Sequence, residues 1–172
     1  HGNREERSGG EFDSTGYLDG STLIEQPGMK KYDLAPRVRD RYEASIAYSP
    51  SEKWSLSVGG TSRQDDYEGS ELGLLEEKER TGTVGVEFQP TDRLQLMGSV
   101  GWVKNETSQA SRESGATVVL SDTTRWTAEL TDETIYWSAG FAWSAPRGKW
   151  GLSGLFDINR APSTYDLANF KK

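Results

Sequence analysis

Side chains alternate between apolar and polar with a period of two throughout residues 80–103, and this alternation leaves few folds open to the chain. Small or apolar residues occupy every second position on both sides of a short turn at residues 90–92: Gly82, Val84, Val86 and Phe88 before it, and Leu94, Leu96, Gly98, Val100 and Trp102 after it. Successive side chains of a β-strand point to opposite faces. The pattern therefore predicts a β-hairpin with one apolar face.

The same unit occurs twice more in the chain. Residues 42–48 alternate up to a turn at 49–53 and again over 54–61, and residues 135–143 alternate up to a turn at 144–149 and again over 150–158. Each turn contains proline or glycine, or both, next to polar residues, which is typical of turns between strands. The chain is therefore expected to be all-β, a series of antiparallel up-and-down hairpins.

The hairpins are expected to fill residues 32–165 as antiparallel β-barrel wall. Within them, short turns are predicted at 49–53, 89–93 and 144–149, and long loops at 62–80 and 104–133, the second with a strand pair of its own at 116–120 and 125–130. Residues 1–31 are rich in glycine and charge without periodicity and are predicted to be an irregular polar segment. Residues 166–172 are expected to form a tail.

Composition is unusual for a chain of this size with a buried core. Of 172 residues, 33% are hydrophobic, and the mean hydropathy is −0.75. A sheet with one apolar face fits these values, and so does a transmembrane β-barrel with a polar lumen. Composition alone does not decide between the two.

Charge and residue usage exclude several functions. The net charge of −7 and the absence of a basic patch argue against nucleic-acid binding. Without cysteine, the chain has no disulfides, thiolate metal sites or covalently attached haem of its own. No apolar run is long enough for a transmembrane helix, and no signal peptide is visible at the start. His1 is the sole histidine, so no nucleophilic triad can be assembled, and the chain is not expected to be an enzyme.

Turn lengths and aromatic residues favour the barrel over a β-sandwich. Short turns at one rim and long loops at the other are the layout of outer-membrane barrels, whereas a soluble sandwich has less reason to segregate them. Five aromatic residues lie at strand ends beside the short turns and are predicted to form an interfacial girdle: Tyr48, Trp54, Phe88, Trp143 and Trp150. The alternative is that these rings pack at the base of a soluble sheet.

Longer stretches of the sequence resemble a known family. KYDLAPRVRDRYEASIAYSPSEKWSLSVGG, then DDYEGSELGL, then FQPTDRLQL followed by an aromatic strand resemble, in this order, the MtrB/PioB family of outer-membrane barrels associated with decahaem cytochromes. The resemblance covers residues 31–105 well and extends more loosely to 165. DDYEGSELGL between two hairpins is the more specific part of it.

The resemblance implies a large barrel in the outer membrane of a Gram-negative bacterium. Such a barrel sheathes a periplasmic multihaem c-type cytochrome and lets it meet an extracellular partner, which can be a second cytochrome. The haem would belong to the cytochrome, and this chain would be a scaffold without a cofactor of its own. A diffusion porin or transporter barrel and a secreted all-β adhesion domain are the alternative functions.

This chain is much shorter than members of that family and ends without an aromatic strand, so it resembles an internal piece of such a protein. Six to eight strands reach at most the smallest barrels, and an open sheet edge in lipid leaves backbone groups unsatisfied. We therefore expect neighbouring sequence or partners to complete the wall.

Three groups of residues are candidates for function. Polar-face residues Glu43, Glu87, Gln95 and Asp157 are expected to face the lumen, where they would contact an enclosed cytochrome or line water. The acids Asp65, Asp66, Glu68 and Glu71 are expected to form a solvated acidic loop, with a calcium site as the alternative. Arg37, Arg39, Asp40 and Arg41 are expected to be ordinary rim charges, with strand-anchoring ion pairs or lipid phosphates as the alternatives.

Overall fold

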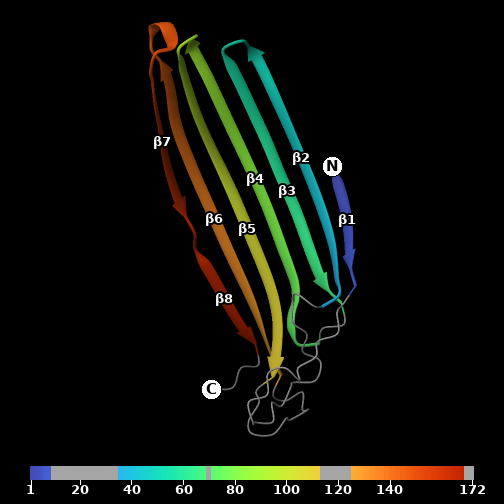
Figure 1. Cartoon of the computed structure of the whole chain (residues 1–172). Coiled ribbons are helices and arrows are strands. Elements are labelled where there is room, and N and C mark those ends of the chain that lie inside the picture. Colours follow the sequence, from blue (N-terminus) through green and yellow to red (C-terminus); the bar gives the residue numbers. More distant parts are fainter. Residues whose placement is uncertain (9–34, 69–70, 113–124, 169–172) are drawn as a thin grey trace, which may run out of the picture.

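The computed structural model describes residues 1–8, 35–68, 71–112 and 125–168, most of which lie in one antiparallel β-sheet (Figure 1). Its strands are β1 (Gly2–Arg7), β2 (Arg37–Ser51), β3 (Trp54–Tyr67), β4 (Gly73–Thr91), β5 (Leu94–Arg112), β6 (Arg125–Ser144), β7 (Gly151–Arg160) and β8 (Ser163–Ala168). Spatial order follows chain order from β1 to β7, and β8 also pairs with β6. The predicted fold class, antiparallel up-and-down β-hairpins in an open part of a barrel wall, is confirmed.

The short turns all lie at one end of the sheet (Figure 1). Two residues separate β2 from β3 and two separate β4 from β5, and a single 3₁₀ turn, Pro146–Gly148, lies between β6 and β7. Gly148 has a φ of 64°, a left-handed conformation that glycine adopts without strain. The connections at the opposite end of the sheet are longer, so the predicted segregation of turn lengths is present.

The predicted long loops are mostly strand, which corrects the sequence interpretation. β3 continues to Tyr67 and β4 begins at Gly73, while β5 continues to Arg112 and β6 begins at Arg125. Residues 125–130 pair with β5, and residues 116–120, their predicted partners, lie outside the described part. The prediction of a strand at 125–130 is confirmed. In the extensions of β3, β4 and β5, charged side chains occupy both faces, so no regular apolar period marks them and the backbone pairing shows that they are strands.

Both ends of the chain also differ from expectation. Within the predicted irregular segment 1–31, Gly2–Arg7 form β1 and pair with β2 from Gly2 opposite Tyr42 to Arg7 opposite Arg37; residues 9–31 lie outside the described part. At the other end, β8 continues to Ala168, into the predicted tail, of which residues 169–172 are not described. Pairing with a neighbouring strand orders both segments in spite of their polar sequences.

β7 and β8 lie end to end along β6 and are separated by Ala161 and Pro162 (Figure 1). Proline has no backbone N–H to donate to a ladder, which accounts for the interruption at this point. Its carbonyl still accepts a hydrogen bond from the Glu133 backbone N–H at 3.0 Å. The two strands therefore act as one interrupted edge of the sheet.

One face of the sheet, here called the outer face, carries a continuous band of large apolar side chains that we call the apolar belt. The strand register aligns these residues in rows that cross the sheet; one such row is Ile46, Val58, Val84, Val100, Trp137 and Ile158. Side chains of the apolar belt are highly exposed, for example 72% for Ile46 and 64% for Phe156 in a neighbouring row. An exposed apolar surface that spans a whole sheet indicates a lipid or protein environment, not water.

The height of the belt matches a membrane. On β5 it runs from Leu94 to Trp102, close to the roughly 9–11 residues of a transmembrane strand. β4, β5 and β6 are 19, 19 and 20 residues long, so they project well beyond the belt at the end opposite the short turns. Among the described residues there is no helix with the length and hydrophobicity of a membrane span.

On the opposite face, the inner face, the Tyr136 ring packs across a glycine. Gly101 on β5 lies directly opposite Tyr136 on β6, and the Tyr136 hydroxyl lies 3.1 Å from the Thr83 hydroxyl on β4. A Cβ at Gly101 would overlap the Tyr136 ring. Glycine is therefore needed here because an aromatic side chain occupies the space above it.

We predict that Gly101→Ala destabilises the folded barrel by about 1–3 kcal/mol, the usual penalty for overpacking. Gly59→Ala is the matched control, because Gly59 lies in the same cross-strand row and a Cβ there makes only ordinary contacts at 3.7 Å. Urea unfolding of the full-length protein in detergent, followed by tryptophan fluorescence, measures both variants. Equal stability of the two would show that the ring moves aside freely.

Candidate functional site: the inner face and its ion-pair network

At the level of the apolar belt, the inner face is built from small side chains. One row crosses five strands in register and contains only alanine, serine and glycine: Ala47, Ser57, Gly85, Ser99 and Ser138. Ser99 and Ser138 share a hydrogen bond of 2.6 Å between their hydroxyls, as do Thr61 and Thr81. Such a surface has low relief, so another molecule can approach the backbone of the wall closely.

The four residues predicted to face a lumen all lie on this inner face. In the strand register, Glu43 is opposite Thr61, Glu87 opposite Met97, Gln95 opposite Ala142, and Asp157 opposite Ser138. Gln95 Nε2 donates to Glu87 Oε2 at 3.3 Å. The structure does not bring the four together: Glu87 and Gln95 form one pair, while Glu43 and Asp157 lie on separate strands.

The five aromatic residues predicted to form a girdle lie near the short-turn end, and four of them form two ring pairs. Trp54 and Phe88, directly opposite each other on β3 and β4, stack with ring centroids 4.2 Å apart. Trp143 and Trp150 meet edge to face at 4.9 Å. Tyr48 lies opposite Leu56 and is 62% exposed. Their role as an interfacial girdle remains a prediction.

The predicted acidic loop is in part a strand, which corrects the sequence interpretation. Asp65 and Asp66 lie within β3, where neighbouring side chains point to opposite faces. Asp65 is bound to Arg39, Asp66 accepts from Gln64 Nε2 at 3.3 Å, and Glu68 and Glu71 are exposed. Within the described ranges, no three acidic or histidine side chains are placed to hold a metal ion.

Asp65 is instead the centre of an ion pair on the inner face, beyond the apolar belt. Its side chain has no solvent exposure. Arg39, directly opposite on β2, donates from Nε to Asp65 Oδ1 at 2.6 Å and from Nη2 to Oδ2 at 2.8 Å. A bidentate pair of this kind is the strongest geometry available to an arginine and a carboxylate.

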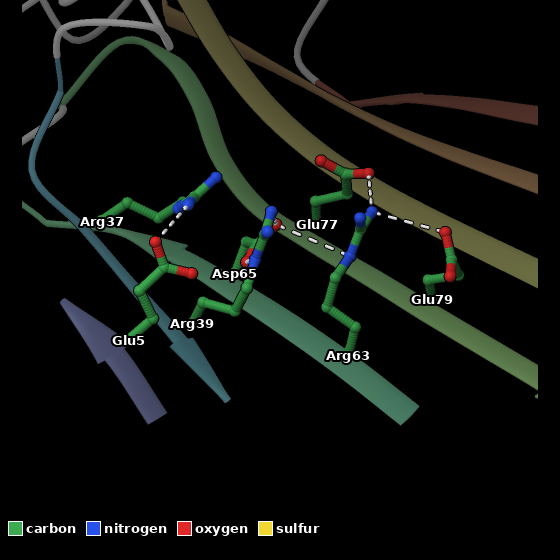
Figure 2. A network of polar contacts seen from close by, with 7 residues as sticks. All are labelled: Glu5, Arg37, Arg39, Arg63, Asp65, Glu77 and Glu79. Carbon is green, nitrogen blue, oxygen red and sulfur yellow. Dashed lines mark hydrogen bonds and ion pairs between the residues drawn. The ribbon is translucent and has the colours of Figure 1, made fainter. Parts of the chain in front are cut away.

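Further charges extend this pair from β1 to β4, and Figure 2 shows the residues involved. Arg63 Nη2 donates to Glu77 at 2.6 Å and lies 3.4 Å from Glu79, while Arg63 Nε lies 3.7 Å from Asp65 Oδ2. On the other side, Arg37 Nη2 is 3.8 Å from Glu5. We call these seven residues the arginine network: Glu5, Arg37, Arg39, Arg63, Asp65, Glu77 and Glu79.

Asp65 stays ionised in spite of its burial. Burial by itself raises the pKa of Asp65, but the hydrogen bonds and charge of Arg39, with the charges of Arg63 and Arg37, outweigh it and hold that pKa below its ordinary value. Asp65 in turn raises the pKa of Arg39 through their hydrogen bonds. The network therefore carries permanent charges of both signs.

The arginine network was missed by the sequence interpretation. Arg37 and Arg39 were expected to be ordinary rim charges, and Arg63 and Glu77 were placed in a loop, whereas the structure shows strand-anchoring ion pairs, one of the alternatives. A signal is present in retrospect: Arg37, Arg39 and Arg41 share one face, as do Arg63 with Asp65 and Glu77 with Glu79, because each pair is two residues apart.

Comparison with known proteins agrees with this architecture. The family model of the outer membrane beta-barrel porins MtrB/PioB matches residues 1–170. The Outer membrane protein MtrB of Shewanella baltica (strain OS185) is 25% identical over 139 residues, which cover 81% of this chain and 19% of that protein. The chain thus spans about a fifth of the length of this relative. With a match over nearly its whole length, this outer-membrane chain belongs to the MtrB/PioB family of β-barrel porins.

Proposed function

We propose that this chain is part of the wall of an outer-membrane barrel that encloses a multihaem c-type cytochrome and so allows electrons to cross the membrane. In this arrangement the apolar belt faces lipid and the inner face meets the cytochrome. The long-connection end faces the outside of the cell, as in outer-membrane barrels generally, and is where an extracellular cytochrome would approach. The chain acts as a scaffold, and the haems belong to its partner.

The observation that supports this proposal best is the low relief of the inner face. The row of small residues at belt level leaves room for a folded protein to lie against the wall. The polar groups around it, including Glu87 and Asp157, provide hydrogen-bond and charge contacts for such a protein. Close contact matters because a sheath has to fill the gap between the wall and its contents.

The test is the haem content of the full-length protein purified in mild detergent through a tag, measured by haem stain and visible spectrum. A stoichiometric multihaem protein is expected to co-purify. Ser57→Trp, which places a bulky ring on the inner face, is expected to reduce the haem-to-barrel ratio severalfold. Val58→Trp is the matched control, because the next residue points to the outer face and is 55% exposed.

A barrel that folds and requires detergent but carries no haem would contradict the proposal and leave a diffusion porin or transporter. Equal haem retention by both tryptophan variants would show that the small-residue row is not in contact with the partner. Folding of each variant is checked separately, by the resistance of the barrel to unfolding on unheated gels.

A further inference from the structure

We propose that the inner face holds an oxyanion-binding pocket at the β1 end of the arginine network. A cavity of about 400 Å³ is lined there mainly by arginines: its walls are Arg7, Arg37, Arg39, Arg63, Tyr67, Leu74 and Glu77. Glu77 is the sole acid among these seven. Four arginines against one acid in the lining favour an anion over a cation in this cavity.

The strand register concentrates positive charge at this cavity. Arg7 on β1 lies directly opposite Arg37 on β2, and Arg39 follows on the same face two residues later. Like charges directly opposite each other destabilise a sheet. An anion in the cavity that Arg7 and Arg37 both line would relieve this repulsion.

The arginines differ in how far acids already satisfy them. Arg39 is fully engaged by Asp65. Arg63 donates from Nη2 to Glu77 at 2.6 Å, while its buried Nε has no hydrogen-bond partner among the described residues. Arg37 is 15% exposed at its side chain, and its one carboxylate partner within 4 Å among the described residues is Glu5, at 3.8 Å. The Tyr67 hydroxyl, a neutral group, also interacts with Arg37.

Arg37 Nε is buried and has no hydrogen-bond partner among the described residues. A buried donor left unsatisfied is unfavourable, and a charged one more so. Among Arg37, Arg39 and Arg63, Arg37 also has the longest carboxylate contact, 3.8 Å against 2.6 Å for the other two. It is therefore the residue that an incoming anion would bind first.

The ligand chemistry follows from the guanidinium group. Arginine presents a planar fork of donors that matches the oxygens of a carboxylate or a phosphate. Two sources are available on the lumen side: a free inorganic anion, or an acidic side chain of the enclosed protein. The second source rests on the proposed function, and the first does not.

The first arm of the test measures binding of inorganic phosphate to the full-length barrel in detergent, by titration calorimetry. Arg37→Gln is expected to weaken binding about tenfold or more, as loss of a charged hydrogen bond does, and Arg37→Lys to weaken it less. Arg41→Gln is the matched control, because Arg41 lies on the same face of β2 outside the cavity and is 56% exposed. The affinity of Arg41→Gln for phosphate is expected to stay within about twofold of the wild-type value.

The second arm measures how much haem protein each variant retains, with and without added phosphate. If Arg37→Gln loses phosphate binding but retains the haem protein like Arg41→Gln, the ligand is a free anion. If Arg37→Gln selectively releases the haem protein, and phosphate elutes it from wild type, the ligand is a carboxylate of that protein.

If Arg37→Gln and Arg41→Gln bind phosphate equally well and retain the haem protein equally well, the proposed anion-binding pocket is contradicted. If wild type carries no haem protein, the proposed function fails, and the phosphate arm alone still decides whether the pocket exists.

Discussion

Asp65→Ala is expected to destabilise the folded barrel by about 3 kcal/mol, since removal of one partner of a buried ion pair leaves the other charge uncompensated. Asp65 is fully buried, and Arg39 and Arg63, each 25% exposed, lose the carboxylate that neutralises them. Partial exposure of both arginines places the expected value at the lower end of the range for buried pairs. Urea unfolding of the full-length protein in detergent, followed by tryptophan fluorescence, measures the loss.

The matched control for this substitution is Glu43→Gln. Glu43 also pairs with an arginine of β2, Arg41, at 3.2 Å, but both side chains are more than half exposed. Exposed pairs contribute at most about 1 kcal/mol, so this variant should remain close to wild type. The double variant Asp65→Ala with Arg39→Met is expected to recover much of the loss, because no charge is then left without its partner. A similar loss in Asp65→Ala and Glu43→Gln would refute the central role of Asp65.

Val86→Arg is expected to cost about 2–4 kcal/mol of folded stability, the penalty for arginine at the bilayer midplane of a barrel. Val86 lies on the central strand β4 in the middle row of the apolar belt, between Leu56 and Gly98. Its exposed position on the outer face would place a guanidinium in hydrocarbon. Folding of the full-length protein into lipid vesicles, followed by urea titration, measures the penalty.

Glu87→Arg is the control for Val86→Arg because it puts the same side chain at the next residue, on the inner face. Glu87 is exposed there and accepts a hydrogen bond from Gln95 at 3.3 Å, so an arginine at this position remains in contact with water. Stability within about 1 kcal/mol of wild type is expected, as for other exposed charges. If both arginine variants fold equally well, the belt does not face lipid and the assignment of the two faces is wrong.

The hairpins at belt level could be predicted because the polarity of each side chain there matches the face of the sheet on which it lies. Val84 and Val86 lie on the apolar outer face, whereas Thr83 and Gly85 lie on the inner face. The alternation of the two faces is therefore visible in the sequence itself. By the same rule the four residues expected to face a lumen, Glu43 among them, share the inner face, and their contact with a lumen remains a prediction. Prolines and polar residues marked the short turns for an equally local reason.

Beyond the belt this rule fails, and the extensions of β3, β4 and β5 were read as loops; in the extension of β6 only residues 125–130 were predicted to be strand. Around Arg63 and Glu77 charged and polar residues lie on both faces of the strands, so no apolar period is visible. Asp65 and Asp66 were grouped because they are adjacent in the sequence, although adjacent side chains of a strand point to opposite faces. Pairing with the next strand, which no single segment encodes, is what orders this region.

The sequence by itself determined the all-β class, the hairpin order and the two-sided character of the wall, because a period of two is a local consequence of strand geometry. Only the tertiary structure decided which charges meet. The register places Asp65 opposite Arg39 and Arg7 opposite Arg37, and a shift of one residue would turn every one of these side chains to the other face. Contacts between strands depend on register, and register is set by the assembled sheet.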